Sequence, residues 1–334
     1  MYNTNRIRLA RKPGEQFQTS DFTEEQLTLA AATEGEAICR VRYISLDPYL
    51  AQMMQAWQGP QKDWGEGIII GRMVGEIIAS NDPSLNVGDW VLGDSRWQGI
   101  EVRKAKQFTK IHLEEGVPAS AFLGVLGSSG LTAWIGVNRV IQPQAGETFT
   151  VSSAAGSVGA IAGQLAKQQG ARVIGIAGGT AKCKEVVETL GFDACIDHNT
   201  EDFEAQLNAA VGSAGIDGHY ENVGAKTLDP ALALMNDNGR IGLCGLIAHY
   251  LNDDAVSLKH FRKLLTSGLS LKGFRVYDYP DDVEEAQKAL RAAVKNGEIA
   301  IRETISEGLS SAPEAYIKML SSGGTGKHLL HLCD

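Results

Sequence analysis

The chain has 334 residues, and at roughly 150 residues per domain this length predicts two domains rather than one compact core. Hydrophobic residues make up 43% and charged residues 21% of the chain, which is typical of globular proteins and excludes a disordered one. The net charge of −9, from 31 Lys and Arg against 40 Asp and Glu, argues against a nucleic-acid partner, because a negative surface repels the phosphate backbone.

The sequence shows no signal for export, membrane insertion or disulfide formation. No stretch approaches the roughly 20 apolar residues of a membrane helix, and the polar start at residues 1–6 lacks the apolar core of a signal peptide. The cysteines are odd in number and widely spaced, unlike a disulfide framework or a structural zinc site. We expect a soluble, cytoplasmic protein with no membrane partner. Its buried free thiols would be Cys39, Cys183, Cys195, Cys244 and Cys333.

Up to about residue 115 the sequence predicts short strands in close succession. Residues 37–44 alternate apolar and polar side chains as a half-buried strand does, and residues 68–78 predict strands with glycines at bulges or turns. A turn at residues 86–89 precedes another strand. Short strands at this spacing predict a small, partly closed β-barrel.

From about residue 119 strands and helices alternate. A short apolar strand at 147–151 leads into a glycine-rich turn, a helix up to Gln169 and a second buried strand at 172–177. This alternation predicts βαβ units and a doubly wound parallel sheet. A helix over residues 182–190 follows and ends at Gly191. Further strands are expected at residues 194–197, 217–222, 240–244, 269–274 and, in the C-terminal tail, 327–332.

The turn at residues 154–159 carries the clearest chemical signal. It follows the pattern G-x-G-x-x-G, with Ala154 in place of the first glycine and with Gly156 and Gly159 in the other two positions. Between a strand and a helix, small residues let the backbone and the helix N-terminus approach a pyrophosphate. The turn therefore favours a dinucleotide site, although plain strand–turn–helix junctions can carry the same pattern.

The same turn differs by one residue from the G-x-S-x-G turn that presents the nucleophilic serine of hydrolases. A hydrolase would also need an oxyanion-hole motif upstream and an Asp/His pair downstream. The sequence has no such upstream motif, and nothing marks His249 as a catalytic base. Ser157 is therefore not expected to be a nucleophile.

The end of the strand at 172–177 indicates which dinucleotide is bound. NAD sites usually carry an acidic residue about 20 residues after the glycine motif, where it accepts a hydrogen bond from the ribose 2′-hydroxyl. Here no acidic residue occurs before Glu185, whereas Lys182 and Lys184 could neutralise a 2′-phosphate. The alternative is that these lysines are solvent-exposed residues at the start of a helix and bind no ligand. The absence of an acidic residue nevertheless favours NADP(H) over NAD(H).

Several motifs in order along nearly the whole chain resemble the medium-chain dehydrogenase/reductase superfamily. The resemblance is closest to its zinc-independent branch of NADP-dependent alkenal double-bond reductases and prostaglandin reductases. The motifs are residues 45–50 (SLDPYL), 130–134 (GLTAW), 154–159 (AAGSVG), 177–179 (AGG), 217–224 (DGHYENVG), 244–247 (CGLI) and 326–327 (GK).

The resemblance implies an α/β fold in which a GroES-like β-barrel substrate domain, residues 1–118 with 295–334, accompanies a doubly wound Rossmann NADP-binding domain, residues 119–294. It also implies NADPH-dependent reduction of the C=C bond of α,β-unsaturated ketones or aldehydes, with hydride added to the β-carbon and a proton to the α-carbon. The partner would be a small-molecule enone or enal, and the chain would form a homodimer. A quinone reductase of the same superfamily and a non-catalytic NADPH sensor remain as alternatives.

The functional positions of the family carry over to this chain one by one. Tyr49 and Tyr250 match positions that face the substrate, where a phenol would donate to the developing oxyanion. Lys182 would meet the 2′-phosphate. The other positions expected to contact the cofactor are Ala155, Gly156, Ser157, Val158, Gly178, Asn222, Cys244, Gly245, Leu246, Ile247, Tyr250, Phe274, Arg275 and Val276.

Two cofactor positions depart from the family pattern. The Asp-Tyr that usually follows the third strand of the cofactor domain is Asp197-His198 here, so an imidazole would make the contact beside the adenosine phosphate. Gly324 stands where an asparagine is common, which removes one side-chain contact.

Zinc-dependent relatives need Cys and His ligands in the first domain, where this chain offers only Cys39 and His112 and no Gly-His-Glu triplet. We therefore expect no metal site. Met53, Met54, Trp57 and Trp64 indicate either an apolar, adaptable substrate pocket or ordinary packing in the core or at a dimer interface.

Overall fold

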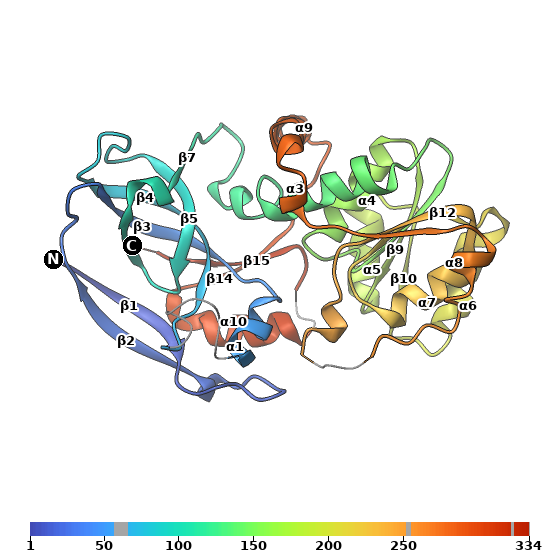
Figure 1. The fold of residues 1–334 in the computed structure, drawn as a ribbon, viewed down its shortest axis with the longest axis horizontal. Coiled ribbons are helices and arrows are strands. Elements are labelled where there is room, and N and C mark those ends of the chain that lie inside the picture. Colours follow the sequence, from blue (N-terminus) through green and yellow to red (C-terminus); the bar gives the residue numbers. More distant parts are fainter. Residues whose placement is uncertain (57–65, 252–254, 322–323, 334) are drawn as a thin grey trace. The chain divides into compact units, whose positions relative to one another are not determined.

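The computed structural model describes residues 1–56, 66–251, 255–321 and 324–333. The chain forms two compact units, one of Met1–Leu123 with Glu303–Asp334 and one of Gly124–Arg302 (Figure 1). The sequence places these boundaries at 118/119 and 294/295.

The unit Gly124–Arg302 is built on a six-stranded parallel sheet with the order β10-β9-β8-β11-β12-β13. All residues of the central strand β8 are buried, as expected where helices cover both faces. The strand order reverses between β8 and β11, and such a switch point opens a crevice at the carboxyl edge of a sheet. This is the predicted doubly wound arrangement. The strands are β8 (Thr148–Ser152), β9 (Arg172–Ala177), β10 (Ala194–Asp197), β11 (Ile216–Glu221), β12 (Met235–Leu243) and β13 (Ser270–Gly273).

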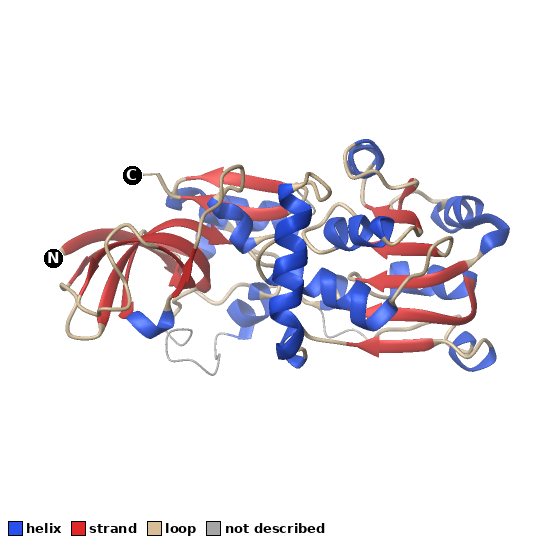
Figure 2. Cartoon of the chain, turned by 90° about the horizontal axis from the view of Figure 1, so that it is seen from above, coloured by secondary structure: helices blue, strands red, loops and turns tan. Residues whose placement is uncertain are grey.

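Helices lie on both sides of this sheet (Figure 2). Right-handed crossovers in opposite directions place α4 and α5 on one face and α6 and α7 on the other. On the second face, α6 and α7 pack against the sheet through a buried apolar cluster that includes Leu207 of α6, Leu228 of α7 and Ile241 of β12. The helices are α3 (Ser128–Ile135), α4 (Gly159–Gln168), α5 (Thr180–Glu188), α6 (Phe203–Val211), α7 (Ala225–Leu234), α8 (Lys263–Thr266) and α9 (Val283–Lys295), and a π-helical segment spans Gly136–Ile141.

The other unit contains a seven-stranded sheet in the order β14-β15-β3-β4-β5-β7, with β6 also paired to β3. The C-terminal tail supplies β14 and β15, and β15 runs antiparallel to β3. A separate hairpin of β1 and β2 completes the unit. Its elements are β1 (Tyr2–Leu9), β2 (Phe22–Leu29), β3 (Glu36–Ser45), α1 (Leu50–Ala56), β4 (Ile70–Ser80), β5 (Trp90–Arg96), β6 (Ile100–Lys104), β7 (Thr109–Ile111), β14 (Glu303–Glu307), α10 (Ala312–Leu320) and β15 (Lys327–His331).

Two expectations need correction. The β1–β2 hairpin was not expected, because β2 is rich in polar residues and only alternate side chains are shielded from solvent. The cysteines are free, but they are not all buried. Cys39 and Cys183 are buried, whereas Cys195 and Cys244 are partly buried and Cys333 is exposed. Among the described residues, no helix has the length and apolar character that crossing a membrane requires.

Candidate functional site

The loops that follow β8, β9, β11 and β12 lie at one edge of the sheet, because parallel strands end on the same side. The strand order reverses in the middle of this edge, where doubly wound proteins bind their ligands. Most of the site residues predicted from the sequence belong to these loops.

The turn after β8 is as tight as the glycine pattern predicts. Ser153 adopts a positive φ of 51°, and its carbonyl accepts a hydrogen bond of 2.8 Å from the N–H of Gly156. A Cβ at Gly156 would lie 2.6 Å from Ser153 Oγ, and one at Gly159 would lie 2.3 Å from Ser153 O. Gly159 therefore requires glycine, because a Cβ there would clash with the backbone, whereas at Gly156 the nearest atom is a serine hydroxyl that can rotate. The turn passes directly into α4.

Ala154 serves in the first glycine position because its side chain points into the protein. It is fully buried, and its Cβ packs against the backbone of Gly175 on β9, where an added Cβ would come within 2.8 Å. The methyl group thus fills a space inside the sheet and leaves the outer side of the turn open.

Ser157 holds an unsatisfied polar atom in this turn. Its Oγ is buried and has no hydrogen-bond partner among the residues that the structure describes. This excludes the serine–histidine pair of a hydrolase in this structure, and His249 instead packs on Gly224, where an added Cβ would lie 2.5 Å from the imidazole. A buried hydroxyl without a partner at the start of a helix fits a phosphate oxygen as its acceptor.

The end of β9 is held by Asp197, the last residue of β10. Its Oδ1 accepts hydrogen bonds from the N–H of Gly179 (2.8 Å) and of Asn199 (2.9 Å). These bonds lower the pKa of Asp197, so the carboxylate stays ionised and one of its oxygens is bonded to the backbone. Asp197 thus fixes the shape of the loop Gly178–Gly179.

His198 lies over this loop. A Cβ on Gly178 would lie 3.1 Å from His198 Nε2, so the glycine makes room for the imidazole. His198 Nδ1 is buried, and the described part of the chain provides no hydrogen-bond partner for it. Burial, and after it the positive charge of Lys226, lowers the pKa of His198, and Lys182 acts in the same direction. An anion such as a 2′-phosphate would satisfy both the free nitrogen and the surrounding positive charge.

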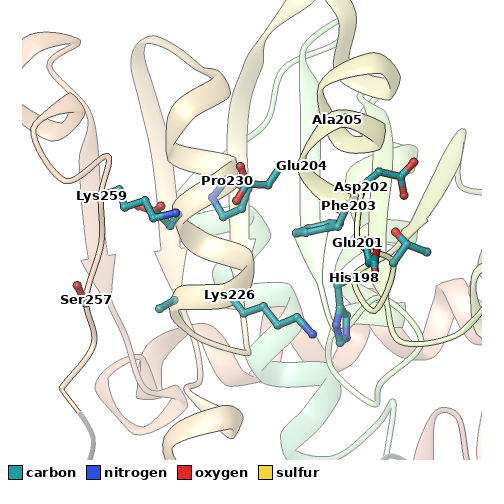
Figure 3. A pocket seen from close by; sticks show the side chains of 13 residues that line it. His198, Glu201, Asp202, Phe203, Glu204, Ala205, Lys226, Pro230, Ser257 and Lys259 are labelled. Carbon is teal, nitrogen blue, oxygen red and sulfur yellow. The ribbon is translucent and has the colours of Figure 1, made fainter.

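Lys226, the second residue of α7, is a site residue that the sequence analysis missed. It extends toward the imidazole of His198 (Figure 3), and its Nζ donates to Asn199 Oδ1 at 3.4 Å. Both residues line a cavity of about 700 Å³ between the starts of α6 and α7. The sequence signal was its place directly after the motif at residues 217–224. Lys182, in the first turn of α5, is partly buried, and this burial lowers its pKa.

Asn222 joins the two strands at the switch point. Its side-chain amide donates to Ser152 O (2.8 Å), and its backbone N–H donates to Ser152 Oγ (2.7 Å). The loop after β12 is attached to the same place, because Ile247 N–H donates to Asn222 O at 3.1 Å. Asn222 thus sits where β8, β11 and the loop after β12 meet.

Glu221, just before Asn222, organises this junction and was also missed. It is fully buried and accepts hydrogen bonds from Ser152 Oγ (2.8 Å), Thr227 Oγ1 (2.9 Å) and the backbone N–H of Gly224 (2.9 Å). Burial alone would raise the pKa of Glu221, but the contact with His219 (2.7 Å) and, after it, the backbone N–H groups of Gly224 and Val223 bring the pKa below its usual value. An acidic residue at the end of a buried strand was the signal available in the sequence.

The segment 244–250 runs along the same edge. Cys244 and Gly245 both donate their N–H groups to Glu221 O. A Cβ on Gly245 would lie 3.2 Å from Tyr250 Oη, so this glycine brings the phenol close to the backbone. Burial raises the pKa of Tyr250, while a hydrogen bond with the Leu246 backbone opposes the shift. Leu246 and Ile247 form the turn between these residues and are partly buried or exposed.

After β13 the chain supplies three further predicted residues. Phe274 is buried and packs edge-to-face on Tyr220, with ring centroids 6.0 Å apart. Arg275 is exposed and makes two hydrogen bonds with Asp278, at 2.7 and 3.1 Å, while Val276 begins a short 3₁₀ turn. Phe274 therefore belongs to the wall of this edge, whereas the Arg275 guanidinium is held by its own loop.

Three further groups of predicted residues belong to the other unit. Tyr49 precedes α1 and is 46% exposed. Gly324 has a φ of 81°, and a Cβ there would lie 2.5 Å from the His328 ring, so the backbone conformation leaves no room for an asparagine. Met54 is fully buried and Met53 partly buried in α1, whereas Trp57 and Trp64 lie outside the described residues.

The catalytic zinc site of zinc-dependent relatives does not fit this chain. Cys39 is buried, its thiol contacts Arg40 O at 3.6 Å, and burial raises its pKa far above the usual range, so it is not a ready thiolate. His112 is exposed. Among the described residues, neither belongs to a group of His, Cys, Asp or Glu close enough to share a metal ion.

Known proteins match this chain over nearly its full length. Residues 157–294 match the family described as zinc-binding dehydrogenase, and residues 5–111 match the N-terminal domain of oxidoreductase. The NADPH-dependent curcumin reductase of Escherichia coli (strain K12) is 37% identical over 97% of this chain and 95% of its own. The 2-alkenal reductase (NADP(+)-dependent) of Nicotiana tabacum is 33% identical over 89% and 87% of the two chains.

A solved structure agrees with these sequence matches. CurA from Vibrio vulnificus in complex with NADPH superposes with a TM-score of 0.91 and 34% identity over 99% of each chain. The chain therefore belongs to the medium-chain dehydrogenase/reductase superfamily, in the group that includes the curcumin, 2-alkenal and prostaglandin reductases.

Proposed function

We propose that this protein reduces the C=C bond of α,β-unsaturated ketones and aldehydes with NADPH. Relatives named as NADPH-dependent curcumin reductase and NADP(+)-dependent 2-alkenal reductase support this reaction class. The observation that carries the proposal is the pair of buried, unpartnered polar atoms, Ser157 Oγ and His198 Nδ1, at the carboxyl edge of the parallel sheet. Phosphate oxygens are the acceptors that both would suit.

The loops of this edge would bind the two charged parts of NADPH. The turn Ala155–Val158 and the N-terminus of α4 would hold the pyrophosphate, because backbone N–H groups and the helix dipole favour an anion there. Lys182, His198 and Lys226 would hold the 2′-phosphate near Gly178. NADH lacks this phosphate, and Asp197 already accepts two backbone N–H groups through Oδ1.

Asn222, Cys244 to Tyr250, and Phe274 would hold the nicotinamide half. When bound, NADPH supplies a hydride to the β-carbon of the enone. Negative charge then develops on the carbonyl oxygen, and a preorganised hydroxyl that donates to this oxygen lowers the barrier. Tyr250 is suited to this task, because its raised pKa keeps the phenol protonated and its position is set by Gly245 and Leu246. Tyr49 would act as the second donor, from the substrate domain.

The domain roles and the assembly are part of the same proposal. Residues 124–302 would bind the cofactor, and the β-rich unit would supply the substrate pocket. The protein would act as a homodimer in the cytoplasm. Exposed apolar side chains beside the edge strand β13, namely Phe261, Leu265 and Leu271, offer a surface for a second copy.

The test is NADPH oxidation with a panel of enones, enals and quinones, followed by product analysis. We expect saturated ketones and aldehydes as products, with NADH a poor substitute for NADPH. Turnover of quinones without turnover of enones would assign the chain to the quinone reductases. Tight NADPH binding with no turnover of any compound would point to a sensor.

A further inference from the structure

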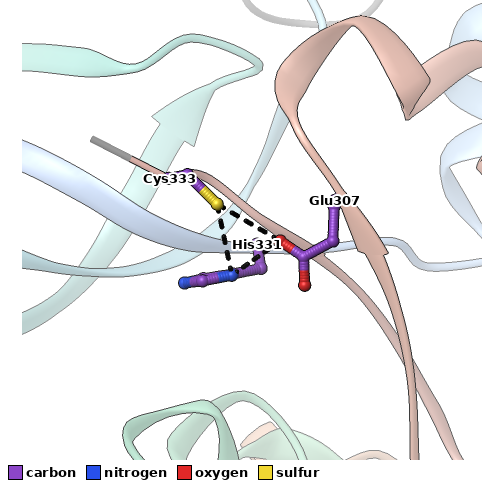
Figure 4. A group of neighbouring side chains, drawn as sticks. All are labelled: Glu307, His331 and Cys333. Atoms are coloured by element: carbon purple, nitrogen blue, oxygen red, sulfur yellow. Dashed lines mark hydrogen bonds and ion pairs between the residues drawn. The ribbon is translucent and has the colours of Figure 1, made fainter.

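Strands β14 and β15 bring a glutamate, a histidine and a cysteine together (Figure 4). Glu307 and His331 are partners in the parallel register of these strands, and Cys333 follows two residues after His331. The atoms Glu307 Oε2, His331 Nδ1 and Cys333 Sγ all lie within 4.8 Å of one another. In the part of the chain that the structure describes, no other group of three such side chains is this close.

The sequence predicts no metal site, because its cysteines are widely spaced and these three residues come together only through strand pairing. We propose that Glu307, His331 and Cys333 nevertheless bind one zinc ion, or a cation of the same class such as Co²⁺, with water completing the coordination. Carboxylate, imidazole and thiolate are all zinc ligands, and a cysteine in the set selects against hard cations such as Mg²⁺. The site lies within the β-rich unit and does not rest on the proposed reductase activity.

The spacing of the three atoms is close to what a tetrahedral zinc ion needs. With Zn–N and Zn–O near 2.1 Å and Zn–S near 2.3 Å, ligand atoms are separated by about 3.4 Å for N–O pairs and about 3.6 Å for pairs with sulfur. The observed distances are 2.8 Å from Nδ1 to Oε2, 3.4 Å from Sγ to Oε2 and 3.8 Å from Sγ to Nδ1. The two pairs with sulfur are within about 0.2 Å of the required separation, and Nδ1 and Oε2 would move apart by about 0.6 Å to seat the ion.

Without an ion the three side chains contact one another. Cys333 Sγ donates to Glu307 Oε2, and His331 Nδ1 lies 2.8 Å from the same oxygen. On binding, the ion replaces these contacts. The thiol proton leaves to solvent, and His331 coordinates through Nδ1 in the neutral tautomer that carries its proton on Nε2. A carboxylate and a thiolate then balance the two positive charges of the ion.

The ligands are held in place by the surrounding sheet. His331 O accepts from Gly308 N–H at 2.8 Å, and Leu332 N–H donates to Arg42 O at 2.8 Å. The ring of Tyr43 stacks on the imidazole with centroids 4.7 Å apart. Because neighbouring groups that orient a ligand strengthen metal binding, these contacts prepare the site for an ion. The ion would also tie the edge strand β14 to β15.

The proposal can be tested with the full-length protein after chelator treatment and gel filtration. Zn²⁺ binding is measured by competition with a chromophoric chelator, and Co²⁺ binding by absorption. We expect one ion per chain, a thiolate-to-Co²⁺ charge-transfer band, and no binding of Mg²⁺. Cys333→Ser, His331→Gln and Glu307→Gln should each weaken Zn²⁺ binding at least about tenfold, as loss of supporting groups does at metal sites.

His112→Gln is the matched control, because His112 is an exposed histidine of the same unit outside the cluster. It should bind Zn²⁺ like the unmodified protein. Far-ultraviolet circular dichroism of each variant shows whether the fold is intact. Equal Zn²⁺ affinity of the Cys333→Ser variant and the unmodified protein, or Co²⁺ binding without the thiolate band, would overturn the proposal. So would one ion per two chains with a change in oligomeric state, because the ligands would then come from two copies.

Discussion

Lys327 Nζ forms a buried ion pair with Asp47, which joins the loop after β3 to the first residue of β15, 280 positions later in the chain. The side chain of Lys327 is 4% exposed and that of Asp47 is 15% exposed. Ser45 Oγ donates to the same carboxylate at 2.5 Å. Two segments singled out in the sequence, residues 45–50 and 326–327, thus form one structural unit just before Tyr49.

Replacing Lys327 with Met should destabilise the protein strongly, because it leaves Asp47 with little solvent and no cation. Loss of one partner of a buried pair costs roughly 3–5 kcal/mol, and the partial exposure of Asp47 places this case at the lower end. Urea unfolding measures the change. The control is Arg72→Met, which breaks an exposed pair with Asp94 and should cost less than about 1 kcal/mol. Similar losses in both variants would show that the Lys327 pair contributes no more than a surface pair.

Lys182→Ala should weaken NADPH binding and leave NADH binding nearly unchanged. A charge-assisted hydrogen bond to the 2′-phosphate is worth on the order of 1–3 kcal/mol, which corresponds to roughly a 5- to 150-fold rise in Kd. Isothermal titration calorimetry with both cofactors gives the two values. An equal loss of affinity for NADPH and for NADH would contradict a role of Lys182 in recognising the 2′-phosphate.

NADPH binding should be coupled to proton uptake by His198. Burial and the nearby Lys226 and Lys182 lower the pKa of this imidazole in the free protein, whereas Asp197 acts in the opposite direction. A bound phosphate would favour the charged form and raise the pKa. The affinity for NADPH should therefore be constant at pH values below the pKa of His198 in the free protein. It should fall as the pH rises from this pKa to the higher pKa of His198 in the NADPH complex, and level off above that.

Calorimetry in buffers of different ionisation enthalpy counts the protons taken up. The His198→Gln variant isolates the contribution of the phosphate itself, whose own titration near pH 6 is present in both proteins. The carboxylates that line the same cavity, Glu201, Asp202, Glu204 and Asp229, are also unchanged in this variant, as is Lys259. Identical pH profiles for the two proteins would rule out proton uptake at His198.

Tyr250→Phe and Tyr49→Phe test the oxyanion donors. Each change removes a hydroxyl and keeps the ring. We expect kcat to fall roughly 10- to 1,000-fold for a donor that acts in the transition state, with the Kd for NADPH unchanged. Steady-state kinetics at saturating NADPH measures this. If both variants keep their kcat and change only KM, the tyrosines shape the substrate pocket and the proton comes from the cofactor ribose or water.

The sequence predicts those parts of the fold and site that depend on local chemistry. The glycine turn at 154–159 depends on steric limits within a few residues, and the structure shows such a limit at Gly159, where a Cβ would clash with the backbone of Ser153. Contacts between residues far apart in the sequence could not be predicted from local sequence patterns. The ion pair of Asp47 and Lys327 and the approach of Lys226 to His198 arise only once the strands are paired.

The central claim is that hydride passes from NADPH to the β-carbon of an enone. The most direct measurement uses NADPH deuterated at the transferred position of the nicotinamide, a simple enone substrate, and NMR of the product. We expect one deuterium on the β-carbon of the saturated ketone when the reaction is run in ordinary water. In a separate reaction with unlabelled NADPH in heavy water, we expect one deuterium on the α-carbon. Deuterium from NADPH on the carbonyl carbon of an alcohol product, or no transfer at all, would contradict it.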